Sequence, residues 1–248
     1  MERFTVDGIV IRTSVTGEAD RIVWVLTRDR GIIRAFAKGA RGTKSRLHSS
    51  TGLFAYCSFS FYEKNDVYNV TEAELKELFF DLRSSMETLT LAQYFCEVIS
   101  RCVPDKNDEE LYLRLLLNSL HFLCKGEKNS LLIKSVFELR LISAAGFMPS
   151  LVACGECGEF LTDTMYFNAG TGELFCNACG RGRGCPEVHS SVISAMRHIC
   201  FSDFSKIFSF TLPEEQLIAL NRLTETYLKS ALGQEFRLLS YFNDINKN

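Results

Sequence analysis

The sequence lacks any apolar stretch that approaches the ~20 residues of a membrane-spanning helix. Its first eight residues carry charges where a secretory signal would need an apolar run, so we expect a cytoplasmic protein. Proline is scarce, with 4 among 248 residues, and 46% of the residues are hydrophobic against 23% charged. This composition is typical of a globular chain with a real core, and its length suits two modest domains.

The sequence also lacks the common catalytic motifs. It has no phosphate-binding loop of the form G-x-x-x-x-G-K-[ST] and no HExxH motif. No histidine has a nearby nucleophile or metal-ligand partner in the sequence; the four are His48, His121, His189 and His198. We therefore expect a protein that is not an enzyme, although a site assembled from distant residues stays open.

Neither sign of charge is in large excess, because the formal net charge is only -2. The charges are unevenly placed, however. The first 50 residues hold ten Arg or Lys against five Asp or Glu, and the remaining residues hold 18 basic against 25 acidic. This asymmetry indicates a basic module that meets a polyanion, joined to an acidic module with another task.

The residue pattern predicts an α+β protein. Short stretches rich in β-branched and aromatic residues predict strands at 6–13, 21–28, 31–37, 53–62 and 66–72. Five strands are too few for a sandwich and suit a closed barrel of the OB type. Apolar residues at three- and four-residue spacing then predict helices at 85–103, 108–125, 130–145, 187–200 and 213–231. The expected domains are an OB-fold nucleic-acid-binding domain at 1–80 and an α-helical domain at 81–248, with a zinc-binding insert at 151–182.

Four of the ten cysteines form two Cys-x-x-Cys pairs separated by eighteen residues: Cys154, Cys157, Cys176 and Cys179. This spacing is typical of a four-cysteine zinc ribbon, in which two knuckles complete a tetrahedron around Zn²⁺. Four sulfur ligands leave no open position for water or substrate, so we expect one structural Zn²⁺ rather than a catalytic one. The segment between the pairs predicts a small hairpin.

Alternatives remain for these cysteines. They could form a redox pair or be buried thiols, and Cys185 or His189 could replace one zinc ligand. A disulfide framework is not expected, because cytosolic thiols are kept reduced. The other cysteines lie in apolar stretches and are expected to be small buried hydrophobes; they are Cys57, Cys96, Cys102, Cys124 and Cys200.

A long basic segment follows the third predicted strand. Residues 38–50 contain two glycines, four basic residues and no acid, and predict a mobile loop. Together with one residue of the strand itself they give the candidate phosphate contacts, which are Arg34, Lys38, Arg41, Lys44 and Arg46. The alternative is a loop that is basic for solubility alone.

Aromatic residues of the barrel are candidate platforms for stacked bases, although in a small barrel they more often belong to the core. They are Trp24, Phe36, Phe54 and Tyr56. Along the second strand Trp24 lies between Val23 and Val25, so the two faces of that strand are both apolar. One face fills the barrel, and we expect the other to pack against the second domain.

The sequence resembles the bacterial RecO family of recombination mediators. The resemblance lies in Asp7-Gly8-Ile9-Val10-Ile11, Gly17-Glu18-Ala19-Asp20-Arg21, Ala37-Lys38-Gly39-Ala40-Arg41 with Lys44-Ser45-Arg46, and the stretch from Leu139 to Pro149 that leads into the four cysteines. The order and spacing of these segments carry the resemblance over nearly the whole chain.

The resemblance implies an OB domain, a helical domain and a zinc insert in a DNA repair protein that binds single- and double-stranded DNA. It also implies strand annealing, partnership with RecR and single-strand-binding protein, a functional link to the recombinase RecA, and association with the nucleoid. The family's basic loop residues correspond here to Lys38, Arg41, Lys44 and Arg46. A different class of function stays open, namely a zinc-ribbon adaptor for protein interaction or transcription whose basic loop is incidental.

Overall fold

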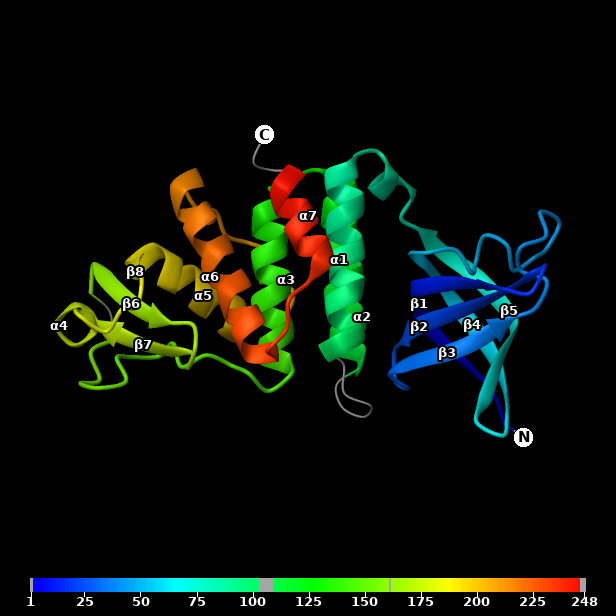
Figure 1. Cartoon of the computed structure of the whole chain (residues 1–248), viewed down its shortest axis with the longest axis horizontal. Helices are drawn as coiled ribbons and strands as arrows, with labels where there is room; N and C mark the ends of the chain where they lie inside the picture. Colours follow the sequence, from blue (N-terminus) through cyan, green and yellow to red (C-terminus); the bar gives the residue numbers. More distant parts are fainter. Residues whose placement is uncertain (1, 103–108, 161, 246–248) are drawn as a thin grey trace. The chain divides into compact units, whose positions relative to one another are not determined.

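The computed structural model describes residues 2–102, 109–160 and 162–245 (Figure 1). By its internal packing the chain divides into two compact units. The first comprises Met1–Cys124 and Phe236–Asn248, and the second comprises Lys125–Glu235. Among the described helices, none combines the length and the apolar character that crossing a bilayer requires.

A closed five-stranded barrel opens the first unit and confirms the predicted OB-like fold. Its strands follow the order β1-β2-β3-β5-β4, with β1 and β4 closing the ring and β3 pairing with β5 in parallel. The bounds are β1 Glu2–Thr16, β2 Asp20–Thr27, β3 Ile32–Ala37, β4 Ala55–Lys64 and β5 Val67–Leu78. Antiparallel β4 and β5 are joined at Asn65 and Asp66, whose φ angles of 52° and 59° are those of a tight hairpin turn.

The period-two pattern of the strands determines which residues fill the barrel. Val23 and Val25 are fully buried in its core, together with Phe59 and Phe61 of β4. Gly8 allows β1 to approach β2 closely, since a Cβ there would lie 2.6 Å from Cγ1 of Val25. The barrel core is thus built from one face of each strand. For the second strand the sequence predicted that one of two apolar faces fills the barrel, and the structure assigns the face of Val23 and Val25.

Helices complete the first unit. They are the 3-10 turn η1 Phe80–Arg83, α1 Met86–Cys102, α2 Glu109–Lys125 and α7 Arg237–Ile245. The predicted ends of α1 and α2 at Val103 and Asp108 lie outside the described residues. The sequence did not predict α7, which packs on α1 and follows the buried Phe236, whose ring meets that of Tyr94 edge-on at 5.8 Å.

The second unit combines three longer helices with a small sheet in the order β7-β6-β8. Its elements are α3 Ser130–Ala144, β6 Thr164–Asn168, β7 Glu173–Cys176, α4 Asn177–Gly180, β8 Glu187–His189, α5 Ser190–Phe201 and α6 Glu214–Leu232. Helix α3 packs against α5 and α6. Its predicted end is confirmed, because Gly146 has φ 95° and the N–H of Phe147 donates to the carbonyl of Ile142, as in a Schellman cap.

One helix boundary in the second unit was predicted wrongly. The sequence predicted a helix from residue 187, but residues 187–189 form β8, which pairs with β6 through Met165 and Val188. The helix begins at Ser190 because Nδ1 of His189 accepts the N–H of Ser191 and caps it. A three-residue strand is too short for its period to show in a sequence.

Candidate functional sites: a cysteine cluster and a basic barrel surface

Four cysteine side chains meet in the second unit. Cys154 and Cys157 lie on the turn before β6, Cys176 ends β7, and Cys179 lies in α4. Their Sγ atoms all lie within 4.8 Å of one another, and Sγ of Cys157 is 3.6 Å from Sγ of Cys176. The structure therefore brings together the four cysteines that the spacing predicted, and their cluster could hold a metal ion.

Main-chain hydrogen bonds hold the two Cys-x-x-Cys segments against each other. The N–H of Gly155 donates to the carbonyl of Leu174 on β7 over 2.8 Å. The N–H of Gly158 donates to the carbonyl of Cys154 over 3.0 Å, and its φ of 78° lies in the left-handed region that favours glycine. The first knuckle is thus fixed to the strand that leads into the second.

The electrostatics of the cluster favour a bound cation. Burial raises the pKa of the Cys154 thiol, but hydrogen bonds from the main chain of Cys157, Cys176 and Glu156 outweigh it and lower the pKa to about 6. Hydrogen bonds shared with Cys176 and Cys157 raise the pKa of Cys179 to about 12. Because neighbouring thiolates repel one another, all four can ionise together only around a positive charge.

Cys185 and His189 lie outside the cluster. The metal-binding group within the described residues contains only the four cysteines named above. Nδ1 of His189 instead contacts Oγ of Ser191 at 2.8 Å and caps α5, while Sγ of Cys185 lies 3.8 Å from the carbonyl of Arg183. The alternative in which either residue replaces a cysteine ligand gains no support from this geometry.

The remaining cysteines divide into two groups. Cys57, Cys96 and Cys200 are buried as predicted, and desolvation raises the pKa of Cys57 to about 12 and that of Cys200 to about 11. Cys102 and Cys124 are only half-buried. Burial of a thiol favours its neutral form, so the first group behaves as small apolar side chains.

The five predicted phosphate contacts are all exposed: Arg34, Lys38, Arg41, Lys44 and Arg46. Arg34 lies on β3, and the others follow on the segment 38–54, which joins β3 to β4 without regular structure. Within the described residues none of the five forms an ion pair with a carboxylate. The surface therefore carries positive charge that the protein does not neutralise.

The basic segment is anchored to the barrel, although the sequence predicted a mobile loop. Oδ1 of Asp20 accepts the N–H of Gly39 over 2.7 Å, and the N–H of Arg41 donates to the carbonyl of Ala19 over 2.9 Å. Between these two anchors Ala40 is fully buried in the barrel core, and later in the segment Leu47 packs against the same core. Both contacts with the turn between β1 and β2 are long-range, which is why the local sequence could not predict them.

The basic segment also raises the positive potential around its neighbours. Nη1 of Arg21 donates to the carbonyl of His48 and to Oγ1 of Thr51, which ties β2 to the segment. Burial and the positive charge of Arg41 lower the pKa of Arg21. Arg21 and Arg41 thus lie close enough for their positive charges to repel each other, which adds to the positive potential of this surface.

The candidate stacking aromatics separate by exposure. Phe54 is fully buried and has φ 68°, so it is a core residue. Trp24, Phe36 and Tyr56 are half-buried. Val23 and Val25 of β2 lie in the barrel core, so Trp24 between them lies on the outer face. Other parts of the chain cover this face only in part, because Leu26 on it is fully buried and Trp24 is not.

Arg12 was not among the predicted site residues, yet it is exposed on β1 beside Trp24. The guanidinium carbon of Arg12 lies 4.6 Å from the centroid of the Trp24 ring. The residue was missed because the register of β1 shifts between Val10 and Arg12, so a simple alternation along the strand does not give its neighbour. Only the pairing of β1 with β2 reveals the contact.

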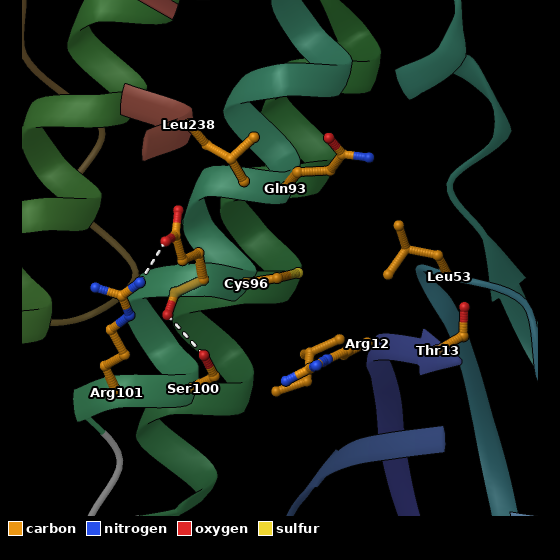
Figure 2. A pocket seen from close by; sticks show the side chains of 10 residues that line it. Arg12, Thr13, Leu53, Gln93, Cys96, Ser100, Arg101 and Leu238 are labelled. Carbon is orange, nitrogen blue, oxygen red and sulfur yellow. Dashed lines mark hydrogen bonds and ion pairs between the residues drawn. The ribbon is translucent and has the colours of Figure 1, made fainter. Parts of the chain in front are cut away.

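A cavity of about 430 Å³ lies between β1 and α1 in the first unit. Arg12 on β1 faces Cys96 and Ser100 on α1 across it, and Leu53 closes one side (Figure 2). Nη2 of Arg101 is 2.6 Å from Oε1 of Glu97, whose Oε2 is buried without a hydrogen-bond partner in the described part of the chain. The cavity is therefore polar on its helical side.

Two segments, which together cover nearly the whole chain, match one family. Residues 1–79 match the description "Recombination protein O N terminal", and residues 83–240 match "Recombination protein O C terminal". The chain belongs to the RecO family. Similarity extends over whole RecO proteins: a DNA repair protein RecO of Acetivibrio thermocellus is 32% identical over 248 residues, which are 100% of this chain and 99% of the relative.

Other RecO relatives show the same full-length coverage. The DNA repair protein RecO of Symbiobacterium thermophilum is 29% identical over 92% of each chain. That of Dehalococcoides mccartyi is 28% identical over 98% of this chain and 96% of its own. The two RecO segments meet between residues 79 and 83, where β5 has ended and η1 lies. The resemblance seen in the sequence is confirmed.

Proposed function

We propose that this chain is a recombination mediator that binds single- and double-stranded DNA and anneals complementary strands. It also helps to load a recombinase onto single-stranded DNA that is covered by single-strand-binding protein. Its proposed partners are RecR and single-strand-binding protein, with a functional link to RecA. Membership of a family whose members are named DNA repair proteins supports the proposal. The exposed cations of the barrel and its anchored loop are the structural observation that carries it.

The proposed mechanism is electrostatic. Two complementary strands repel each other through their phosphates, and a surface that binds both lowers that repulsion. Lys38, Arg41, Lys44 and Arg46 project from a loop whose main chain is fixed to the barrel, so their charges are presented without the entropic cost of ordering the loop. Such a surface promotes annealing without bond chemistry, which fits a protein that is not an enzyme.

The metal is proposed to be one structural Zn²⁺ held by Cys154, Cys157, Cys176 and Cys179. Tetrahedral Zn²⁺ with Zn–S bonds of ~2.3 Å spaces its sulfurs about 3.8 Å apart. The 3.6 Å between Sγ of Cys157 and Sγ of Cys176 is close to that spacing. A bound ion stabilises the fold of the insert and leaves no coordination position for a substrate.

The proposed domains are the DNA-binding barrel at 1–80 and a helical domain at 81–248 with the metal insert at 151–182. The family segments, which end at 79 and begin at 83, support the first boundary. Packing groups α1, α2 and α7 with the barrel, so the helical domain contributes to both compact units. We propose a cytoplasmic location in association with the nucleoid, which follows from a role on chromosomal DNA.

Strand annealing tests the proposal most simply. Labelled complementary oligonucleotides should anneal faster with the wild-type chain, and the variant with Lys38, Arg41, Lys44 and Arg46 all changed to Ala should lose most of this acceleration. A matched control removes four exposed cations of the second unit, namely Lys125, Arg181, Lys206 and Arg222. Equal loss in both variants would show that net charge alone matters. No acceleration by the wild type would favour the zinc-ribbon adaptor instead.

A further inference from the structure

Arg12, Trp24 and Arg34 form a row across three neighbouring strands. In the barrel's register Arg12 of β1 is opposite Trp24 of β2, and Trp24 is opposite Arg34 of β3. The guanidinium carbons of Arg12 and Arg34 lie 4.6 Å and 5.7 Å from the centroid of the Trp24 ring. Both arginines are exposed, and the tryptophan is half-buried on the outer face.

Neither arginine of the row has an anionic partner in the described part of the chain. Each guanidinium lies against the Trp24 ring, whereas Arg28, Arg101 and Arg183 are each paired with a glutamate. A guanidinium stacked on an aromatic ring still directs its N–H donors outwards in its own plane. The row therefore offers two oriented sets of donors that suit phosphate oxygens.

Hollows flank the row on both sides. Arg34 lines a surface hollow of about 250 Å³ together with Arg30, Phe36 and Tyr68. Arg12 lines the cavity of about 430 Å³ between β1 and α1 (Figure 2). One carboxylate lines each hollow, namely Asp66 the first and Glu97, which is paired with Arg101, the second. Along the row itself an aromatic ring lies between two cations. This is the combination by which proteins follow a single strand, with cations on phosphates and rings on bases.

We propose that Arg12, Trp24 and Arg34 are the part of the DNA interface that recognises unpaired nucleotides. This inference rests on the DNA binding proposed above. Arg34 contacts the ring loosely at 5.7 Å, so a base can take its place on Trp24 while the guanidinium turns to a neighbouring phosphate. In a duplex the faces of the bases are covered by their neighbours and cannot reach the ring. The row thus selects single strands, and the loop cations bind phosphates of either form.

Intrinsic tryptophan fluorescence reports on this ring alone, because Trp24 is the only tryptophan in the sequence. Emission from Trp24 is recorded during titration with a short oligothymidylate and with a duplex of equal length, at one salt concentration. Anisotropy of the labelled DNA is measured in parallel to report total binding. We expect the single strand to quench the emission as it binds, and the duplex to bind with little change in emission.

Two variants and a control test the Trp24 ring itself. Trp24→Leu keeps an apolar side chain but removes the platform, and should weaken binding of the single strand about tenfold to a hundredfold, the range for loss of one stacked base. Binding of the duplex should stay nearly unchanged. Trp24→Phe keeps a ring and should retain most of the affinity. The matched control is Phe80→Leu, since Phe80 is an exposed ring that contacts Arg83 in η1; it should have no effect.

The outcomes separate this inference from the proposed function. If both DNA forms bind but Trp24 emission stays constant and Trp24→Leu binds the single strand normally, the row is not the single-strand site and the proposed function stands. Equal losses on single strand and duplex in Trp24→Leu would also overturn the selectivity. If neither DNA form binds the wild type, both proposals fail.

Discussion

Nζ of Lys134 lies 2.9 Å from Oε1 of Glu138, and neither side chain is exposed to solvent. Both residues lie on α3, one helical turn apart. Nζ of Lys134 also lies 3.2 Å from Oε2 of Glu225 on α6, and the hydroxyl of Thr224 donates to Oε2 of Glu138 over 2.8 Å. A buried ion pair with these extra partners joins the two helices that pack most closely in the second unit.

Loss of one partner of this pair should be strongly destabilising. Lys134→Ala leaves the Glu138 carboxylate buried without its cation, which costs about 3–5 kcal/mol in comparable pairs. The double variant Lys134→Met with Glu138→Leu removes both charges and should recover most of the loss. Urea unfolding of the three proteins measures this, and an unchanged midpoint for Lys134→Ala would contradict the assignment.

Removal of the metal should lower the stability of the second unit before it affects DNA binding. Metal binding at a closed four-cysteine site is coupled to folding, whereas the exposed cations lie on the barrel. We expect a chelator to lower the melting temperature and to release about one equivalent of Zn²⁺, detected by a colorimetric dye. Loss of DNA binding by a chain that stays folded after chelation would reverse the assignment.

Gly180 should be needed for metal binding by the insert, although it is not one of the four cysteine ligands. A Cβ at this position would lie 2.5 Å from the ring atom Cγ of Tyr166 on β6 and 2.7 Å from its Cβ, which is closer than these atoms can approach. Gly180→Ala should therefore displace α4, which carries Cys179, and weaken metal retention. Gly182→Ala is not a suitable control because of its φ of 82°, so Gly42→Ala in the loop serves instead. Zinc content of the two purified variants is the measurement.

The buried thiols should resist alkylation in the native state. Desolvation raises the pKa of Cys57 to about 12 and that of Cys200 to about 11, and a reactive thiolate is therefore scarce at pH 8. In the unfolded chain the thiols ionise near their usual pKa of ~8.5, whereas the folded chain keeps them neutral. The free energy of unfolding should therefore fall as the pH rises above ~8.5. Mass spectrometry after iodoacetamide treatment should find both unmodified until denaturant is added.

The sequence predicted the features that depend on local pattern. The five strand patterns predicted the closed barrel, and the spacing of the cysteine pairs predicted the cluster. The predicted helix ends at residues 145 and 231 lie within one residue of the observed ends, because Gly146 and Gly233 form left-handed caps and such caps have a local signature.

Features that depend on pairing between distant segments were missed. The anchoring of Gly39 by Asp20 joins residues 19 positions apart, and the contact of Arg12 with Trp24 depends on a shift in strand register. Helix α7 is short and is stabilised by packing on α1, so its own pattern did not reveal it. Each of these three features depends on tertiary contacts that a local sequence pattern does not contain.

The most direct test of the account is the salt dependence of single-strand affinity. Each phosphate contact contributes about -0.7 to the slope of log affinity against log salt concentration for single strands. Changing Lys38, Arg41, Lys44 and Arg46 together to Ala should flatten the wild-type slope by up to about 3. The control variant of Lys125, Arg181, Lys206 and Arg222 should keep the wild-type slope, and both should melt near the wild-type temperature. A wild-type slope near zero, or an unchanged slope in the loop variant, would contradict the account.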